Sequence, residues 1–178
     1  MTELDFMILD WVQAHLRCGF LDTLMPIITA LGEYGALWML LTAILLIRKD
    51  TRQTGVMLAI ALALDVLLCN VILKPLVARP RPFALREIEL LIAAPRDFSF
   101  PSGHSAASFA AAGALLFGKS RGRWAALLLA TAIALSRLYL YVHYPSDVVC
   151  GAALGLLCGF VGVIFARKWF PSCKNRKK

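Results

Sequence analysis

The sequence predicts an all-α, integral-membrane helical bundle, and three observations lead to this fold class. Of the 178 residues, 60% are hydrophobic and the mean hydropathy is +0.71, whereas soluble domains are about 45–50% apolar. The apolar residues gather in runs that are bounded by charges, Pro or Gly. One run, 53–73, would be about 30 Å long as a helix, which matches the hydrocarbon core of a bilayer.

The expected elements follow one another along a single domain that covers residues 1–178. The segment 2–31 mixes apolar with acidic residues, and we expect an interfacial helix that leads into a span near 20–32. The remaining apolar runs are expected to cross the bilayer at 33–48, 53–73, 101–118, 123–141 and 146–168. The sequence therefore predicts five membrane spans, or six if 20–32 also crosses.

The charge distribution predicts the orientation of these spans. The formal net charge is +8, from 19 Lys and Arg against 11 Asp and Glu. The basic segments 48–52, 119–123 and 167–178 fall on one side of the bundle, which the positive-inside rule assigns to the cytoplasm. The loop 74–100 and the turn 137–146 then face outward. Because membrane topology accounts for the basic loops, we expect no nucleic-acid partner.

The one long loop leaves two structures open. Residues 85–92 carry Leu, Ile and Glu in a pattern that fits a short amphipathic helix over the site, at the lipid headgroup level. An ordered surface loop is the alternative. The five cysteines are scattered without metal-ligand spacing, so we expect no disulfide and no metal.

The string Phe-Pro-Ser-Gly-His at 100–104 is typical of a helix start that can bind an anion. Pro is favoured at the first helical position, and the first backbone amides of a helix attract phosphate oxygens. Gly103 permits close approach of a ligand, Ser102 adds a hydroxyl, and His104 can supply a proton. The alternative is an ordinary helix start with an interfacial histidine.

A second string places Arg137, His143 and Asp147 near the next span end. Asp147 follows His143 by four residues, close enough to hold one ring nitrogen and leave the other as a nucleophile. Pro145 lies between them, so we expect a turn that leads into a helix. The planar Arg137 guanidinium matches phosphate oxygens. The alternative is an interfacial Arg–Asp pair with a solvated histidine.

The third string contains Lys74 and Arg81 at the outward end of the 53–73 span. Pro80 and Pro82 flank Arg81 and restrict the backbone there, which lowers the entropy cost of holding the guanidinium in place. The alternative is a positive cap on a membrane helix. However, these cations lie on the side where the positive-inside rule disfavours them, so we interpret them as anion ligands.

Together the three strings resemble the signature of the type 2 phosphatidic acid phosphatase superfamily, which reads K-x6-RP, PSGH and SR-x5-H-x3-D. Every fixed position is present, in order, over residues 74–147. The helical run is similar to the family from about residue 20 to 168. Small bacterial members of this kind include undecaprenyl-pyrophosphate and phosphatidylglycerophosphate phosphatases.

The resemblance implies that Lys74, Arg81 and Arg137 hold the substrate phosphate together with Ser102 and Gly103. Phosphoryl transfer depends mainly on positioning and on stabilising charge at the phosphate oxygens. Three fixed cations and a helix N-terminus can do this without a divalent metal. We therefore expect no metal and no cofactor.

The resemblance also implies the catalytic roles. His143 would attack phosphorus and become phosphohistidine, Asp147 would orient His143, and His104 would protonate the leaving oxygen. Water would then release phosphate, with His104 acting as the base.

The function implied by the resemblance is that of a lipid phosphatase in the bacterial plasma membrane, with its site on the extracytoplasmic side. We expect the substrate to be an isoprenoid diphosphate, undecaprenyl pyrophosphate, because an outward site suits a carrier lipid that has delivered its load. Phosphatidylglycerophosphate or phosphatidic acid is the alternative substrate, and transfer of the phosphoryl group to another lipid is an alternative reaction. A small lipid or anion transporter is the non-enzymatic alternative. The expected partners are the lipid substrate and the bilayer.

Two further features concern the spans themselves. Asp65 lies in the middle of 53–73, where an ionised carboxylate is costly, so we expect it to face the bundle or to be protonated. Gly151, Gly155 and Gly159 recur every fourth residue, which is typical of close helix packing. A homodimer is the alternative use of this glycine stripe.

Overall fold

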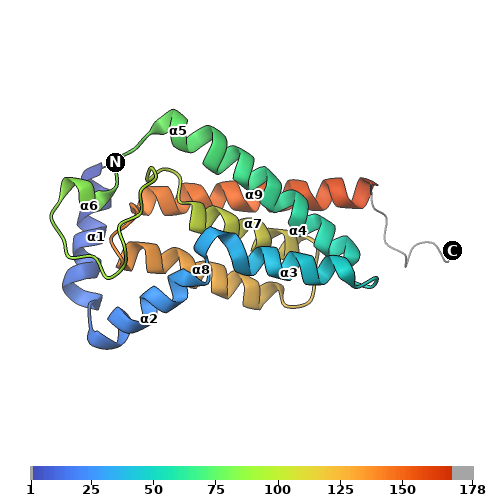
Figure 1. The fold of residues 1–178 in the computed structure, drawn as a ribbon, viewed down its shortest axis with the longest axis horizontal. Helices are drawn as coiled ribbons and strands as arrows, with labels where there is room; N and C mark the ends of the chain where they lie inside the picture. The colour runs from blue at the N-terminus through green and yellow to red at the C-terminus, as the bar shows by residue number, and fades with distance from the viewer. Residues whose placement is uncertain (1, 170–178) are drawn as a thin grey trace.

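All regular elements of residues 2–169, the part of the chain that the computed structural model describes, are helical (Figure 1). The all-α prediction is therefore confirmed for this range, while the basic tail 170–178 and Cys173 lie outside it. In chain order the elements are α1 (Thr2–Leu16), α2 (Gly19–Ala30), η1 (Glu33–Gly35), α3 (Ala36–Ile47), α4 (Arg52–Asp65), η2 (Val66–Leu73), α5 (Lys74–Val77), α6 (Pro82–Leu85), α7 (Gly103–Phe117), α8 (Arg123–Tyr139) and α9 (Pro145–Trp169).

Residues 19–47 form one long, kinked stretch of helix. The kink lies in η1, where Tyr34 and Gly35 have positive φ angles of 49° and 66°. In Figure 1, α2 and α3 continue in the same general direction along the bundle. The ranges 20–32 and 33–48, which the sequence offered as separate spans, therefore lie in series along one segment.

Within residues 2–169, three segments are long and apolar enough to cross a membrane, namely Gly19–Ile47, Arg52–Leu85 and Pro145–Trp169. α7 is apolar but has 15 residues, and α8 has 17. Both are short for a helix that spans the hydrocarbon core on its own, which takes about 20 residues.

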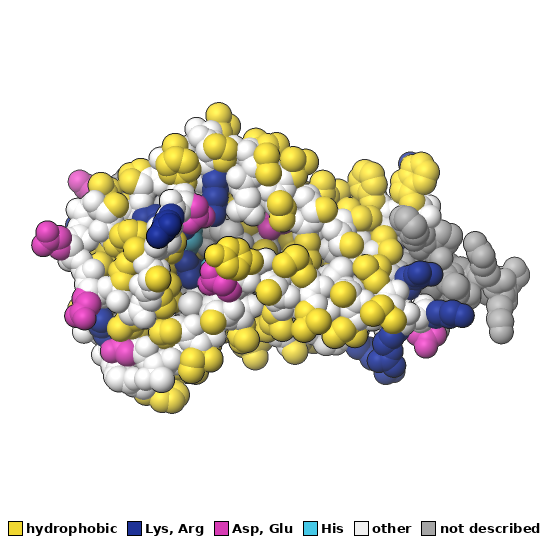
Figure 2. Space-filling view, viewed as in Figure 1, with side chains coloured by type: hydrophobic (Ala, Val, Ile, Leu, Met, Phe, Trp, Pro, Cys, Tyr) yellow, Lys and Arg dark blue, Asp and Glu magenta, His cyan; other side chains and the backbone are white. Residues whose placement is uncertain are grey.

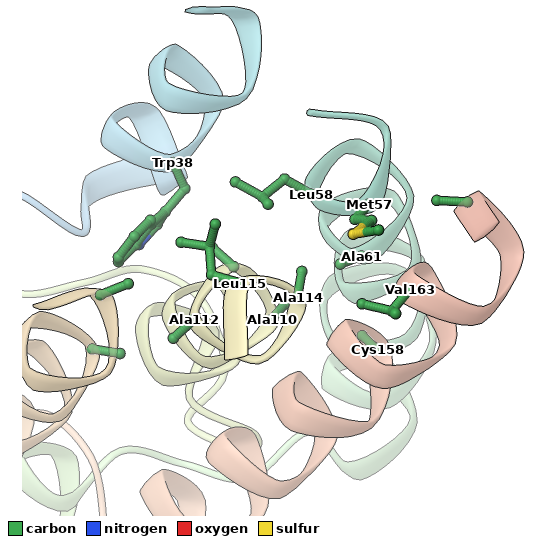
Figure 3. Close-up of a cluster of buried hydrophobic side chains, with 14 of the residues drawn as sticks. Trp38, Met57, Leu58, Ala61, Ala110, Ala112, Ala114, Leu115, Cys158 and Val163 are labelled. Carbon is green, nitrogen blue, oxygen red and sulfur yellow. The ribbon is translucent and has the colours of Figure 1, made fainter. Parts of the chain in front are cut away.

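The core of the bundle forms around α7, whose small side chains let its neighbours approach closely. Figure 3 shows Ala110 and Leu115 of α7 among side chains from three other helices, including Leu58 of α4, Val163 of α9 and Trp38 of α3. The Trp38 indole N–H also donates to Ser108 Oγ at 3.0 Å, which satisfies both buried polar groups.

The glycine stripe of α9 packs against α7. A Cβ added at Gly155 would lie 2.3 Å from the Ala106 carbonyl oxygen, and one at Gly159 would lie 2.6 Å from the Ala114 nitrogen. Real Cβ atoms do not approach backbone so closely, so glycine at these positions allows α9 to pack against α7 of the same chain. A homodimer stays a prediction, and it would need another surface.

The two ends of the bundle differ in what they carry. Lys and Arg side chains gather at the end next to the C-terminal tail (Figure 2), where the α3–α4 and α7–α8 connections lie. The opposite end carries α1, the loop before α7 and the turn between α8 and α9 (Figure 1). All three strings singled out in the sequence reach this second end.

The loop before α7 is irregular beyond α6, so the amphipathic helix over 85–92 is not formed and the loop alternative is correct. Its apolar residues Leu90, Leu91 and Ile92 pack against the buried Leu140 and Val142. These long-range contacts give the apolar side chains a place to be buried without a helix.

Candidate active site

His143 lies in the turn between α8 and α9, and its side chain is 1% exposed. Pro145 begins α9, so the expected turn leading into a helix is present. The ring nitrogen Nδ1 lies 3.5 Å from Asp147 Oδ2, and Nε2 lies 3.1 Å from Arg81 NH1. Burial, together with the charges of Arg81, Arg137 and Lys74, lowers the pKa of His143 well below its usual value. The imidazole is therefore neutral at pH 7, the form that can act as a nucleophile.

Asp147 lies in the first turn of α9 and is fully buried. Its Oδ2 accepts hydrogen bonds from Ser99 Oγ at 2.5 Å and from the Tyr144 N–H at 3.1 Å. Its Oδ1 accepts one from Arg79 NH1 at 2.6 Å. These three donors hold the carboxylate beside Nδ1 of His143, where it can orient the ring.

Arg79 connects Asp147 to the N-terminal helix. Its NH2 donates to Asp5 Oδ2 of α1 at 2.9 Å, its NH1 donates to Ser146 Oγ at 2.8 Å, and its guanidinium stacks 3.7 Å from the centre of the Tyr144 ring. Burial lowers the pKa of Arg79, but the hydrogen bonds and charges of Asp5 and Asp147 outweigh burial and raise it. α1 is thus tied to the turn that carries His143.

A helix starts within the predicted string, but it begins at Gly103 with Ser102 as its cap, so Pro101 precedes the helix and does not occupy its first position. Ser102 Oγ accepts from the Ser105 N–H at 3.4 Å and from Ser105 Oγ at 3.0 Å. Ser102 is fully buried, and its own N–H donates to the Asp147 carbonyl oxygen at 3.1 Å. The hydroxyl that the sequence assigned to phosphate binding is therefore engaged in the cap.

Gly103 brings a cation close to the N-terminus of α7. A Cβ at this position would lie 3.3 Å from Asn70 Oδ1 and 3.4 Å from Lys74 Nζ. Lys74 follows η2, a stretch of wide π-helical turns, and such turns occur frequently at functional sites. Asp65, Asn70 and Lys74, spaced by five and four residues, all line the same cavity.

Lys74 and Arg81 share one carboxylate. Asp97 Oδ2 contacts Lys74 Nζ, and Asp97 Oδ1 accepts from Arg81 NH2 at 2.6 Å. The other edge of the Arg81 guanidinium donates from NH1 to the Val142 carbonyl oxygen at 2.7 Å. The hydrogen bonds and charges of the two cations outweigh the effect of burial and hold the pKa of Asp97 below its usual value.

Arg137 and His104 present buried nitrogens that have no hydrogen-bond partner among residues 2–169. Arg137 donates from NH1 to Thr29 Oγ1 at 2.6 Å, while its Nε is unpaired. His104 Nε2 is also unpaired and lies 3.7 Å from Glu33 Oε2. Buried polar atoms of this kind are rare without a ligand or a water to bind.

A cavity of about 1420 Å³ joins these groups to an apolar groove. Its polar end is lined by Lys74, Arg81, Gly103, His104, Arg137 and His143. Its apolar part runs between α3 and α4, past side chains that include Met39, Leu46, Leu62 and Val66. On the face shown in Figure 2, a histidine is visible between basic and acidic side chains.

The structure thus gathers six of the eight predicted site residues around one cavity, with Ser102 and Asp147 buried behind it. Asp65 also lines the cavity and is fully buried, as expected for a residue that faces the bundle, and neither carboxylate oxygen has a described partner. The sequence reasoning missed Arg79, Asp97 and Ser99. Two signals were available, the repeated Arg-Pro at 79–82 and the polar residues directly before the 100–104 string.

Chemically, the arrangement suits attack by a neutral imidazole on phosphorus. His143 is the buried nucleophile candidate, Asp147 orients it, and the α7 N-terminus and several guanidinium or ammonium groups surround the position a phosphate would take. Preorganised donors of this kind stabilise the charge of a transferring phosphoryl group.

Comparison with known proteins identifies the family. Residues 53–171 match the PAP2 superfamily. The undecaprenyl-diphosphatase of Sulfolobus acidocaldarius is 35% identical over 145 residues, covering 79% of this chain and 70% of that protein. The decaprenylphosphoryl-5-phosphoribose phosphatase of Mycobacterium tuberculosis is 37% identical over 130 residues, covering 73% and 72%.

A solved structure agrees with these sequence matches. The crystal structure of a transmembrane PAP2 type phosphatidylglycerolphosphate phosphatase from Bacillus subtilis superposes with a TM-score of 0.78 at 27% identity, over 96% of this chain and 88% of that one. It is a membrane protein with the same helical arrangement. The chain therefore belongs to the PAP2 superfamily and is an integral-membrane phosphatase that acts on lipid phosphates.

Proposed function

We propose that this enzyme hydrolyses the terminal phosphate of an isoprenoid diphosphate, with undecaprenyl pyrophosphate as the substrate and undecaprenyl phosphate and orthophosphate as products. The observation that carries the proposal is the cavity that places His143 at the head of an apolar groove between α3 and α4. A groove bounded by two helices suits one long prenyl chain better than two acyl chains. The names of the relatives from Sulfolobus and from Bacillus subtilis, both undecaprenyl-diphosphatases, support this choice.

The reaction proceeds in two steps. Nε2 of His143 attacks the terminal phosphorus, the bond from phosphorus to the bridging oxygen breaks, and His104 protonates that oxygen on the departing lipid monophosphate. Water, deprotonated by His104, then attacks the phosphohistidine, the P–N bond breaks, and orthophosphate leaves. Asp147 holds the Nδ1–H of His143 throughout, and Lys74, Arg81 and Arg137 balance the charge of the phosphoryl group.

Phosphatidylglycerophosphate is the second candidate substrate, because the superposed Bacillus subtilis enzyme carries that activity in its name. Purified protein in detergent should be given undecaprenyl pyrophosphate, phosphatidylglycerophosphate and phosphatidic acid at matched concentrations. The proposal expects the highest kcat/KM for undecaprenyl pyrophosphate, with no loss in EDTA. Preference for either glycerolipid would replace the substrate, and loss in EDTA restored by one divalent ion would replace the mechanism.

We also propose five membrane crossings, by 19–47, α4 with η2, α7, α8 and α9, with α1 lying in the outer interface. The basic segments at 48–52 and 119–123 then lie in the cytoplasm and the active site lies outside, in a bacterial plasma membrane. A Glu89→Cys variant in a Cys18→Ser background should react in intact cells with a thiol reagent that cannot cross membranes. Reaction only after lysis would invert the topology.

A further inference from the structure

The loop before α7 places a carboxylate where a phosphate is expected. Asp97 contacts Lys74 Nζ through Oδ2 and Arg81 NH2 through Oδ1, and its backbone oxygen accepts from Arg81 Nε at 2.8 Å. One residue of the chain therefore engages both cations of the K-x6-RP string. The Asp97 side chain is nevertheless 51% exposed, whereas that of Arg81 is 5% exposed.

The opposite edge of Arg81 covers the nucleophile. Its NH1 lies 3.1 Å from His143 Nε2, while Nδ1 of the same ring faces Asp147. An Nε2 that accepts a hydrogen bond from a guanidinium has its lone pair engaged. Attack needs phosphorus within about 3–3.5 Å of that nitrogen, so the Arg81 guanidinium has to release Nε2 before the reaction.

Two other nitrogen atoms at the site lack a hydrogen bond to any described residue. Arg137 Nε and His104 Nε2 are buried and have no hydrogen-bond partner in the described part of the chain. Carboxylate and phosphate oxygens bind the guanidinium fork in the same bidentate way. A phosphate that binds Arg137 and His104 therefore competes with Asp97 for the donors of Lys74 and Arg81.

We propose that Asp97 is a specificity-determining residue, an internal anion that occupies the phosphate position and that only a terminal phosphate displaces. The proposal rests on the proposed function to the extent that Lys74 and Arg81 hold the substrate phosphate. A terminal phosphate carries up to two negative charges, whereas the phosphodiester of an ordinary membrane lipid carries one. Displacement of a carboxylate that bridges two cations favours the doubly charged group. Asp97 thereby keeps the abundant phosphodiester lipids of the bilayer out of the site.

Direct binding tests this role without depending on the lipid substrate. Calorimetry on the detergent-purified protein should compare orthophosphate with dimethyl phosphate, a soluble phosphodiester, in wild type and in Asp97→Asn. Without the competing carboxylate, the Kd for orthophosphate should fall by about fivefold or more, since a larger fraction of the protein is competent to bind. Dimethyl phosphate should bind Asp97→Asn measurably and wild type weakly or not at all.

The controls separate competition from support of the two cations. Asp97→Glu keeps the anion and should bind orthophosphate as wild type does. Glu89→Gln removes the same charge from an exposed position of the same loop and should also leave binding unchanged. Asp97→Ser, a smaller neutral variant, should repeat the result of Asp97→Asn if the latter folds poorly.

Three outcomes would overturn the proposal. An unchanged or larger Kd for orthophosphate in both neutral variants would mean that Asp97 only positions Lys74 and Arg81. If neither wild type nor the neutral variants bind orthophosphate and no lipid on the substrate panel is hydrolysed, the proposed function is wrong as well. Wild-type hydrolysis with weaker phosphate binding in Asp97→Asn would overturn the role of Asp97 alone.

Discussion

Replacing Arg79 with Gln should weaken both the fold and the chemistry, because this side chain joins Asp147 to the N-terminal helix. The change removes the hydrogen bond to Asp147 Oδ1 at 2.6 Å and the bond to Asp5 Oδ2 at 2.9 Å. Arg79 NH1 donates to Oδ1, so the carboxylate of the fully buried Asp147 would lose this charged partner.

The structure sets the size of the effect. Removing one partner of a buried ion pair costs about 3–5 kcal/mol, and the Arg79 side chain is 19% exposed, which favours the lower end of that range. For a chain of this length, about 3 kcal/mol corresponds to a decrease in Tm of roughly 6–12 °C. The activity should fall by about 10–100-fold, the usual effect of removing a group that orients a catalytic ligand from outside the site.

The assay is phosphate release by purified protein in detergent, with Tm measured on the same samples. Because Arg79 does not line the cavity that holds the substrate, the loss should appear in kcat while KM stays close to wild type. Arg79→Lys should recover part of kcat only, since one ammonium cannot reach both carboxylates. The control is Arg86→Gln, which also removes an Arg that contacts α1, through Asp10 and Phe6, but at an exposed position.

The reasoning would be refuted if Arg79→Gln raised KM without lowering kcat, or if Arg86→Gln and Arg79→Gln changed kcat equally. The first result would place Arg79 on the substrate. The second would mean that the connection to α1, rather than the bond to Asp147, supports the active site.

Three further predictions concern the nucleophile and the packing. His143→Gln should abolish phosphate release and the acid-labile phosphoenzyme that wild type forms with its substrate, and retained activity would exclude His143 as the nucleophile. The pKa of His143 is lowered on folding, so below its unfolded value of about 6.5 only the unfolded chain takes up this proton. The free energy of unfolding of wild type should therefore fall as pH decreases from 7 to 5, by up to about 1.4 kcal/mol per pH unit from this group, and its Tm should fall with it. The Tm of His143→Gln should fall less steeply with pH, and equal slopes would contradict the assignment. Gly155→Ala places a Cβ 2.3 Å from the Ala106 carbonyl oxygen and should cost about 1–3 kcal/mol by overpacking, whereas Gly19→Ala, with nothing within 4 Å, should leave Tm unchanged.

The positions of the helices could be predicted from the sequence because their causes are local. A helix in lipid satisfies its backbone hydrogen bonds within itself, so an apolar run with charged or proline-containing borders is enough to predict it. The turn before Pro145 follows from a residue type that acts on its immediate neighbours. A helix start at 100–104 was also predicted, but the cap by Ser102 was not. The loop before α7 was harder, because Leu90 and Ile92 pack against a turn some fifty residues later in the chain.

The kink at Tyr34 is a second feature that the sequence predicted only in part. The apolar pattern indicated helix on both sides of residues 32–35, but it gave no direction for the second helix relative to the first. The positive φ angles of Tyr34 and Gly35 turn the chain by a small amount, so α2 and α3 run in series instead of folding back. Two candidate spans therefore became one segment.

By itself, the sequence determined the fold class, the order of the three strings and the residue types that suit phosphoryl transfer. Only the tertiary structure decided which cation meets which anion. Arg79 and Arg81 are both followed by Pro and look alike in the sequence, yet Arg79 binds Asp147, 68 residues away, and Arg81 binds Asp97. The choice depends on how α1, α7 and α9 approach one another in space, because an ion pair forms where two buried charges are brought within contact, whatever their separation along the chain.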